Sequence, residues 1–206
     1  SYLAESVEDV LSYMKDYPRM VVKAPWSSSG RGVRFVESEI SSYHVGWIRH
    51  VIERQGSVIV EPYYHKVKDF GMEFYSDGMG GVNYLGLSLF HTKNGAYTGN
   101  VIATEEEKSK ILSRYIPDDL ISIVRENIRN GFGRLYGRRY RGFFGVDMMV
   151  ISTADQDGFL LHPCVEINLR LTMGHVALLI PPFADGFPRV MQITLTDKYR
   201  LRIHKP

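Results

Sequence analysis

The stretch CVEINLR, residues 164–170, places three polar side chains that could do chemistry at a spacing of two residues. Glu166, Asn168 and Arg170 alternate with apolar residues, which is typical of a strand with one polar face. A carboxylate, a carboxamide and a guanidinium on one face are costly unless a partner lies opposite them. The pattern therefore predicts a ligand for this face.

A fourth polar residue breaks an apolar pattern just upstream. Asp147 lies in GFFGVDMMV, where every other residue is apolar or glycine, and an isolated ionised carboxylate there pays for desolvation. Residues 142–152 and 158–169 read as two strands joined by the turn TADQDG. A hairpin of these strands would bring the oxygens of Asp147, Glu166 and Asn168 together, and hard oxygen ligands of this kind suit Mg²⁺.

Asp147 and Arg170 can each also be explained without a ligand. Asp147 could form a buried ion pair with Arg141 or Arg170, which is the simpler interpretation of that carboxylate alone. Arg170 could be a solvated residue at a strand end. The metal interpretation gains weight because it uses all three oxygen ligands, and a guanidinium binds phosphate or carboxylate in a bidentate manner.

Lys23 ends the apolar run MVVKAP and precedes a loop of small residues, SSSGRG. Backbone N–H groups of such a loop approach an anion closely, while the ammonium group supplies a point charge. The stretch lacks the Walker A pattern, and a flexible hairpin loop explains SSSGRG about as well. Its position between two predicted strands, downstream of Lys23, favours a phosphate clamp.

Glu61 ends the apolar run SVIV at the sequence EPYY. Pro62 lacks an N–H group but keeps its carbonyl, so this carbonyl and the Tyr64 N–H could contact the edge of an adenine at a hinge. The alternative is an ordinary strand end with Glu61 in solvent and the tyrosines packed on neighbours.

The elements that position these residues follow from hydrophobic periodicity. A helix is predicted from Val7 to about Asp16, with Ser6 as N-cap and Asp9 in the capping-box position. Further along the chain we expect strands at 19–25, 32–36 and 57–63, a helix at 41–54, a hairpin over 69–92, a polar loop from 91 leading into helices near 105–114 and 118–136, a helix from Thr172, and an edge strand in the tail DKYRLRIHK. Long polar loops are often functional lids, so we expect residues 91–108 and the Ser/Gly loop to close over a ligand.

Composition limits the class of protein. The 206 residues are 44% hydrophobic and 23% charged, with a formal net charge of +2, which gives no support for a polyanionic partner or a membrane surface. Cys164 is the only cysteine, so an intrachain disulfide is excluded and a reducing cytoplasm is the expected compartment.

Taken in order, Lys23 with SSSGRG, the EPYY stretch, DFGME, the isolated Asp147 and EINLR resemble the ATP-grasp superfamily. The resemblance spans almost the whole chain, and the order and spacing of the motifs are more specific than any single motif. It implies an α+β protein of ATP-grasp fold, with two α+β lobes of mostly antiparallel sheets that grip ATP between them.

The resemblance also implies residue roles. The residues expected to bind ATP are Lys23, Ser27, Ser28, Ser29, Gly30, Arg31, Gly32, Glu61, Pro62, Tyr63, Tyr64, Asp69 and Lys93. Lys23 resembles the lysine on the α- and β-phosphates, and Asp69 stands where the family places an acidic ribose ligand. Asp147, Glu166 and Asn168 match ligands of Mg²⁺, with Mn²⁺ as an alternative metal. Arg170 matches the residue that faces the transferred phosphate, which makes Arg170 and Lys23 the catalytic candidates.

The expected domain organisation has two lobes. Residues 1–66 form the lobe with the glycine-rich loop and the hinge, and residues 67–206 form the lobe with the metal site and the lid. Family members usually carry another phosphate-binding lysine and a substrate domain upstream, and the residues before Arg19 have room for neither. We therefore expect poor turnover by this chain alone.

Three functions from different classes remain. The first is an ADP-forming carboxylate–amine ligase, or its catalytic core, which acts on small-molecule substrates, with a homodimer left open and no nucleic-acid or membrane partner. The second is a nucleotide-binding module without catalysis. The third is nucleic-acid binding through a basic cluster with aromatic neighbours, namely Arg134, Tyr136, Arg138, Arg139, Tyr140 and Arg141. The sequence does not identify the substrates, although Tyr97, Thr172 and His175 are candidates for lining their pocket.

Overall fold

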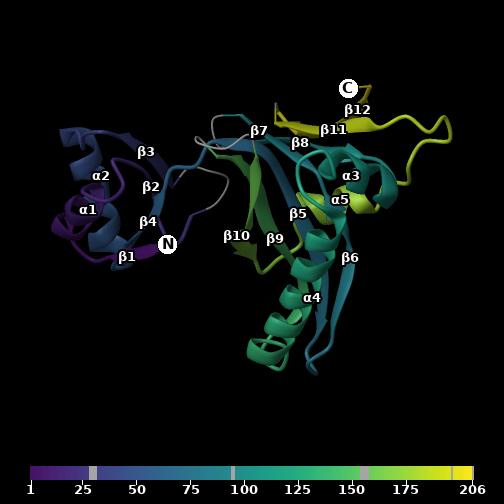
Figure 1. The fold of residues 1–206 in the computed structure, drawn as a ribbon, viewed down its shortest axis with the longest axis horizontal. Coiled ribbons are helices and arrows are strands. Elements are labelled where there is room, and N and C mark those ends of the chain that lie inside the picture. The colour runs from purple at the N-terminus through teal and green to yellow at the C-terminus, as the bar shows by residue number, and fades with distance from the viewer. Residues whose placement is uncertain (28–31, 94–95, 154–157, 196, 206) are drawn as a thin grey trace. The chain divides into compact units, whose positions relative to one another are not determined.

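The strands of the described part of the chain form three four-stranded sheets (Figure 1). The computed structural model describes residues 1–27, 32–93, 96–153, 158–195 and 197–205. The chain divides into two units: Ser1–Tyr64 with Lys93–Tyr97, and His65–Thr92 with Thr98–Pro206. In the part of the chain that is described, none of the helices is both long and apolar enough to span a membrane.

The first unit contains an antiparallel sheet of strand order β1-β4-β2-β3 and two helices. Its elements are β1 (Tyr2–Ala4), α1 (Val7–Met14), β2 (Arg19–Lys23), β3 (Val33–Glu37), α2 (Ser42–Gln55) and β4 (Val58–Pro62). Both helices contribute to one core with the sheet, in which Val10 and Ile48 pack with Met20, Val22 and Val60. The helices therefore cover one face of this sheet.

Both predicted helix starts in this unit are confirmed. Ser6 and Asp9 form the expected capping box, in which the Asp9 N–H donates to Ser6 Oγ at 3.0 Å. The helix ends at Met14, two residues before the expected Asp16. α2 begins after the N-cap Ser41 and ends at Gln55, and the next residue, Gly56, has a φ of 85°, the left-handed conformation that glycine adopts after helix ends.

The second unit is organised around an antiparallel sheet of order β10-β9-β5-β6. Its strands are β5 (Lys66–Asp77), β6 (Val82–Ser88), β9 (Arg141–Ser152) and β10 (Phe159–Asn168), and its helices are α3 (Glu105–Leu112), α4 (Asp118–Leu135) and α5 (Met173–Leu178). One face carries Phe70, Phe74 and Phe144 in a core with residues of α3 and α4, such as Leu112 and Phe132. Side chains alternate between the two faces of a strand, so the odd-numbered residues of β5 and β9 point to the other face. The predicted site residues Asp69 and Asp147 lie on that face.

The remaining strands form a third sheet of order β12-β11-β8-β7. They are β7 (Phe90–Lys93), β8 (Ala96–Ile102), β11 (Arg189–Leu195) and β12 (Tyr199–His204). The expectation of a polar loop from residue 91 into the first helix is therefore wrong, because β8 pairs with β11, where Ile102 lies opposite Arg189. The expected edge strand in the tail is confirmed as β12.

The strand β10 lies at an edge of its sheet, which changes how its two faces are buried. Ile167 pairs with Val146 on the core side but keeps 45% of its surface exposed, and Leu169 keeps 51%. Asn168, on the polar face, is only 8% exposed. Within CVEINLR, burial is thus greatest at Asn168, whereas Glu166 and Arg170 of the same polar face are exposed.

Candidate active site

The pairing of three strands gathers the predicted metal ligands on one sheet face. In the register, Asp147 of β9 lies opposite Glu166 of β10, and Asn168 lies opposite Gly145. Residues opposite each other in a sheet, or two apart on one strand, point to the same side, so Asp147, Glu166 and Asn168 share a face. A register shift between His162 and Glu166 sets this alignment. The hairpin expected from the sequence therefore brings the three oxygen-bearing side chains together.

Two hydrogen bonds in series link Asp147, Asn168 and Arg170. Asn168 Nδ2 donates to Asp147 Oδ2 at 3.0 Å, and Arg170 Nη2 donates to Asn168 Oδ1 at 3.0 Å. Arg170 thus reaches Asp147 through the carboxamide. Within the described ranges, no ion pair joins Asp147 directly to Arg141 or Arg170. The simple buried ion pair considered for Asp147 is not what the structure shows.

The electrostatics of Asp147 favour a cation at this face. Burial is the largest cause that raises the pKa of this carboxyl to about 7, and the neighbouring Glu166 and Glu73 raise it further. The hydrogen bond from Asn168 and the charge of Arg170 act in the opposite direction. Ionised Asp147 is therefore under-compensated by its protein neighbours, and a bound cation would relieve that cost.

Two glycines give this face its shape. A Cβ atom on Gly145 would lie 2.6 Å from Glu73 Oε2 and 2.8 Å from Thr172 Cγ2. A Cβ atom on Gly71, opposite Asp147, would lie 3.1 Å from the carbonyl oxygen of Val146. The missing side chains let polar groups of β5 and β9 and the Thr172 side chain approach each other closely.

Sequence reasoning missed Glu73, which lies on the same face as Asp147. It faces Gly145 across the β5–β9 pair, is only 3% exposed, and contributes to the raised pKa of Asp147. The signal was present, since Glu73 interrupts the apolar run around Phe70 and Phe74 much as Asp147 interrupts its own strand. Thr172 and His175, which we considered as pocket-lining residues, are buried beside Glu73.

In the first unit, the structure joins two predicted ATP-binding residues. Lys23 Nζ lies 2.5 Å from Glu61 Oε2, and their side chains are 22% and 13% exposed. Ser1 Oγ donates to the other Glu61 oxygen at 2.9 Å. Glu61 is thus not a solvated strand end. An anion that binds Lys23 must compete with this carboxylate.

The other predicted hinge residues are partly engaged in the sheet. The Tyr63 N–H donates to the Arg19 carbonyl at 2.9 Å, and the Arg19 guanidinium lies 4.5 Å from the centre of the Tyr63 ring. Pro62 ends β4 opposite Met20. Contacts of Pro62 and Tyr64 with an adenine stay a prediction. Tyr97 belongs to the first unit, and burial raises the pKa of its hydroxyl.

The Ser/Gly loop joins β2 to β3. The Ala24 N–H donates to the Gly32 carbonyl at 2.8 Å, so the loop closes a hairpin at its base. A Cβ atom on Gly32 would lie 2.2 Å from Ser27 Oγ, which explains the glycine. Four residues of the predicted clamp, Ser28, Ser29, Gly30 and Arg31, lie outside the described residues, as does the side chain of Lys93.

Asp69, the predicted ribose ligand, already has two partners in the second unit. Its Oδ2 atom lies 2.5 Å from Lys66 Nζ and accepts a hydrogen bond from Thr92 Oγ1 at 2.6 Å. Its strand parity places it on the same face as Glu73, opposite Met149 of β9. A ribose hydroxyl would have to displace or share these donors.

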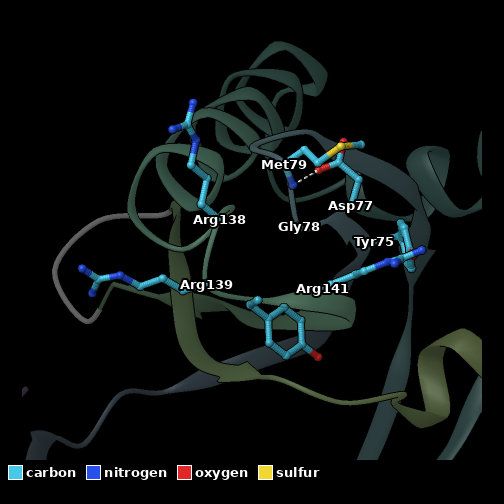
Figure 2. A pocket seen from close by; sticks show the side chains of 8 residues that line it. Tyr75, Asp77, Gly78, Met79, Arg138, Arg139 and Arg141 are labelled. Carbon is cyan, nitrogen blue, oxygen red and sulfur yellow. Dashed lines mark hydrogen bonds between the residues drawn. The ribbon is translucent and has the colours of Figure 1, made fainter.

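The basic cluster considered for nucleic-acid binding surrounds a pocket of about 570 Å³. Its lining residues are Tyr75, Asp77, Gly78, Met79, Arg138, Arg139, Tyr140 and Arg141. In Figure 2, the side chains of Arg138 and Arg139 extend in different directions, and that of Arg141 extends towards Tyr75. Arg134 lies in the last turn of α4, where a cation interacts favourably with the helix dipole. The arginines do not converge on one point, which disfavours this pocket as a phosphate site.

Comparison with solved structures identifies the fold as ATP-grasp, as the sequence motifs predicted. The chain is similar to N5-carboxyaminoimidazole synthetase from Staphylococcus aureus in complex with ADP, with a TM-score of 0.60, 12% identity, and coverage of 94% of this chain and 51% of that one. It is also similar to a biotin carboxylase–ATP complex from Campylobacter jejuni, with a TM-score of 0.61, 15% identity, and coverage of 92% and 45%.

A third similar structure is the biotin carboxylase domain of 2-oxoglutarate carboxylase from Hydrogenobacter thermophilus, in complex with MgADP and bicarbonate. The TM-score is 0.57 at 14% identity, and the match covers 93% of this chain and 45% of that one. No family model and no curated protein matches the sequence. This chain spans about half the length of these three solved structures.

Proposed function

We propose that this chain binds Mg·ATP and belongs to an ATP-dependent, ADP-forming ligase that activates a carboxylate as an acyl phosphate for attack by an amine or a similar nucleophile. The observation that carries the proposal is the convergence of Asp147, Glu166, Asn168 and Arg170 on one sheet face. The ATP-grasp fold and the nucleotide complexes formed by proteins of this fold give independent support.

The residues present fit a magnesium ion that is shared with a nucleotide. Mg²⁺ is usually held by one or two carboxylates together with substrate phosphates rather than by an all-protein cage. Asp147 and Glu166 supply the carboxylates and Asn168 a carboxamide oxygen, once its present contact with Arg170 is exchanged. Within the described residues, no group of three or more His, Cys, Asp or Glu side chains is arranged to hold a metal ion.

In the proposed reaction, a substrate carboxylate oxygen attacks the γ-phosphorus of ATP, the bond to the β-phosphate oxygen breaks, and ADP leaves. The amine then attacks the acyl carbon, inorganic phosphate departs, and the amine loses a proton. Arg170 and Lys23 supply positive charge to the phosphates during transfer. When bound, Mg²⁺ would neutralise phosphate charge and orient the terminal phosphate. No nucleophilic side chain is required.

Calorimetry with ADP in the presence and absence of Mg²⁺ tests the binding step. We expect magnesium-dependent binding by the wild type, a loss of at least about tenfold in Glu166→Ala, and no loss in the matched control Glu106→Ala, which removes an exposed carboxylate of α3. Equal affinity of Glu166→Ala and the wild type would contradict the proposal. ADP release in a screen of small carboxylates and amines then distinguishes a ligase from a nucleotide-binding module without catalysis.

A further inference from the structure

Glu73, Thr172 and His175 form a buried polar cluster that the proposed reaction does not use. Their exposed fractions are 3%, 9% and 4%. Thr172 Oγ1 donates to Glu73 Oε2 at 2.8 Å, and His175 Nδ1 lies 2.9 Å from the same oxygen. The cluster links strand β5 to the start of α5, two segments that are far apart in the sequence.

The geometry of the cluster fixes the orientation of each member. His175 Nε2 lies 3.2 Å from the Phe74 carbonyl, which can only accept, so Nε2 carries the hydrogen. The Thr172 N–H donates to His175 Nδ1, and the His175 N–H donates to Thr172 Oγ1, which forms a capping box. In this tautomer Nδ1 is an acceptor, so its contact with Glu73 Oε2 is not a hydrogen bond, and the Thr172 hydroxyl is the group that bonds Glu73 to the start of α5.

Two glycines close the cluster on both sides. A Cβ atom on Gly174 would lie 1.8 Å from Glu73 Oε1 and 2.5 Å from Ser88 Oγ. A Cβ atom on Gly145 would lie 2.6 Å from Glu73 Oε2. Since a buried carboxylate costs more than an apolar residue of the same volume, packing alone does not explain Glu73. We therefore interpret Glu73 as a residue that fixes the position of the segment leading into α5, to which it is bonded through Thr172.

That segment carries Arg170. Leu169 and Leu171 on either side of it are each 51% exposed, so apolar packing contributes little to the position of this turn. The buried residues that flank it are Asn168, which is bonded to Asp147, and Thr172, which is bonded to Glu73. Arg170 therefore lies between two buried, hydrogen-bonded residues: Asn168, which contacts Asp147, and Thr172, which precedes α5.

We propose that Glu73, Thr172 and His175 are positioning residues that hold the Arg170 guanidinium towards the terminal phosphate of the bound nucleotide. They act through Arg170 and do not touch the reacting atoms. The inference rests on the proposed function, because it needs a triphosphate bound at this face. It extends that function from the residues that contact ligand to the buried group that orients one of them.

The test compares two nucleotides in calorimetry: Mg²⁺ with ADP, and Mg²⁺ with a non-hydrolysable ATP analogue. Arg170→Gln sets the reference, because it removes the contact that depends on the terminal phosphate. Thr172→Val keeps the side-chain shape but removes the hydroxyl bonded to Glu73, whereas Thr172→Ser restores that hydroxyl. We expect Thr172→Val to lose about tenfold in affinity for the analogue relative to ADP, with recovery in Thr172→Ser.

A double variant separates positioning from general support of the fold. If the cluster acts through Arg170, Thr172→Val combined with Arg170→Gln shows no further loss of preference for the analogue beyond Arg170→Gln alone. If Thr172→Val does not fold, Glu73→Gln is measured in its place, with the same selective loss expected. Equal weakening of both nucleotides, or an additive loss in the double variant, would overturn the inference.

The outcomes also separate this inference from the proposed function. A wild type that binds neither nucleotide refutes the proposed function and removes the basis of the inference. A wild type that binds both, with Arg170→Gln selective for the analogue and Thr172→Val not selective, refutes the inference alone.

Discussion

Replacing Asp147 by asparagine should stabilise the metal-free protein at neutral and alkaline pH. The carboxyl has a pKa of about 7 in the folded protein against an ordinary value of 3.8, mainly because of burial and then because of Glu166 and Glu73. Between these two values the unfolded chain releases its proton while the folded protein keeps it. Folding stability attributable to Asp147 therefore falls as pH rises from about 4 to about 7, and the full penalty applies above that range.

The size of the penalty follows from the two values. At about 1.4 kcal/mol for each pH unit, a difference between 3.8 and about 7 corresponds to an upper limit of about 4 kcal/mol. Asparagine has nearly the same shape and no charge, so Asp147→Asn should recover roughly 2–4 kcal/mol at pH 8 and close to nothing at pH 4. The pH dependence of stability should flatten accordingly.

Urea unfolding at pH 4, 6 and 8 without divalent metal measures this effect. Far-ultraviolet circular dichroism is the suitable signal, because both tryptophans, Trp26 and Trp47, lie in the first unit while Asp147 lies in the second. Glu106→Gln, which neutralises an exposed carboxylate of α3, is the control and should leave stability nearly unchanged. An Asp147→Asn protein no more stable than the wild type at pH 8 would refute this electrostatic account of the site.

Three further predictions concern the same chain. The apparent affinity for Mg·ADP should fall about tenfold for each pH unit below about 7, because a proton on Asp147 competes with the metal. An affinity that calorimetry finds constant from pH 5 to 8 would exclude Asp147 as a ligand. Gly145→Ala should destabilise the fold by about 1–3 kcal/mol, because the added Cβ atom would collide with Glu73. Gly131→Ala in α4, where a Cβ atom meets nothing within 4 Å, should stabilise the fold by up to about 1 kcal/mol. Similar unfolding midpoints for the two variants would contradict this prediction. Lys23→Met should weaken ADP binding by about ten- to a hundredfold in calorimetry, and an unchanged affinity would mean that Lys23 serves only its ion pair with Glu61.

The convergence of Asp147, Glu166 and Asn168 could be predicted because it depends on local rules. Two strands joined by a short turn pair as a hairpin, and a period of two fixes which side chains share a face. A register shift between His162 and Glu166 decides the final alignment, and Pro163, which cannot donate a ladder hydrogen bond, is the sequence signal for it. The hairpin and its shared face are confirmed, while the role of these residues as metal ligands stays a prediction.

The strands at 90–93 and 96–102 could not be predicted in the same way. Their polar composition resembles a loop, and β8 becomes a strand because it pairs with β11, which lies far later in the chain. The partner of Asp147 was also decided by tertiary structure, since Arg170 reaches that carboxylate through Asn168 rather than directly. Glu73, by contrast, is predictable from the sequence, because it is an isolated carboxylate in the apolar strand around Phe70 and Phe74, as Asp147 is in its own strand.

The most direct test of the central claim uses Mn²⁺ as a paramagnetic probe of the metal position. In nuclear magnetic resonance spectra of the wild type with ADP, substoichiometric Mn²⁺ should broaden the amide signals around Asp147 of β9 and around Glu166 and Asn168 of β10. This broadening should require ADP, and it should be lost in Glu166→Ala and retained in Glu106→Ala. Broadening centred on the Arg138–Arg141 pocket, or persistent broadening of β9 and β10 in Glu166→Ala, would contradict the assignment of this face as the metal–nucleotide site.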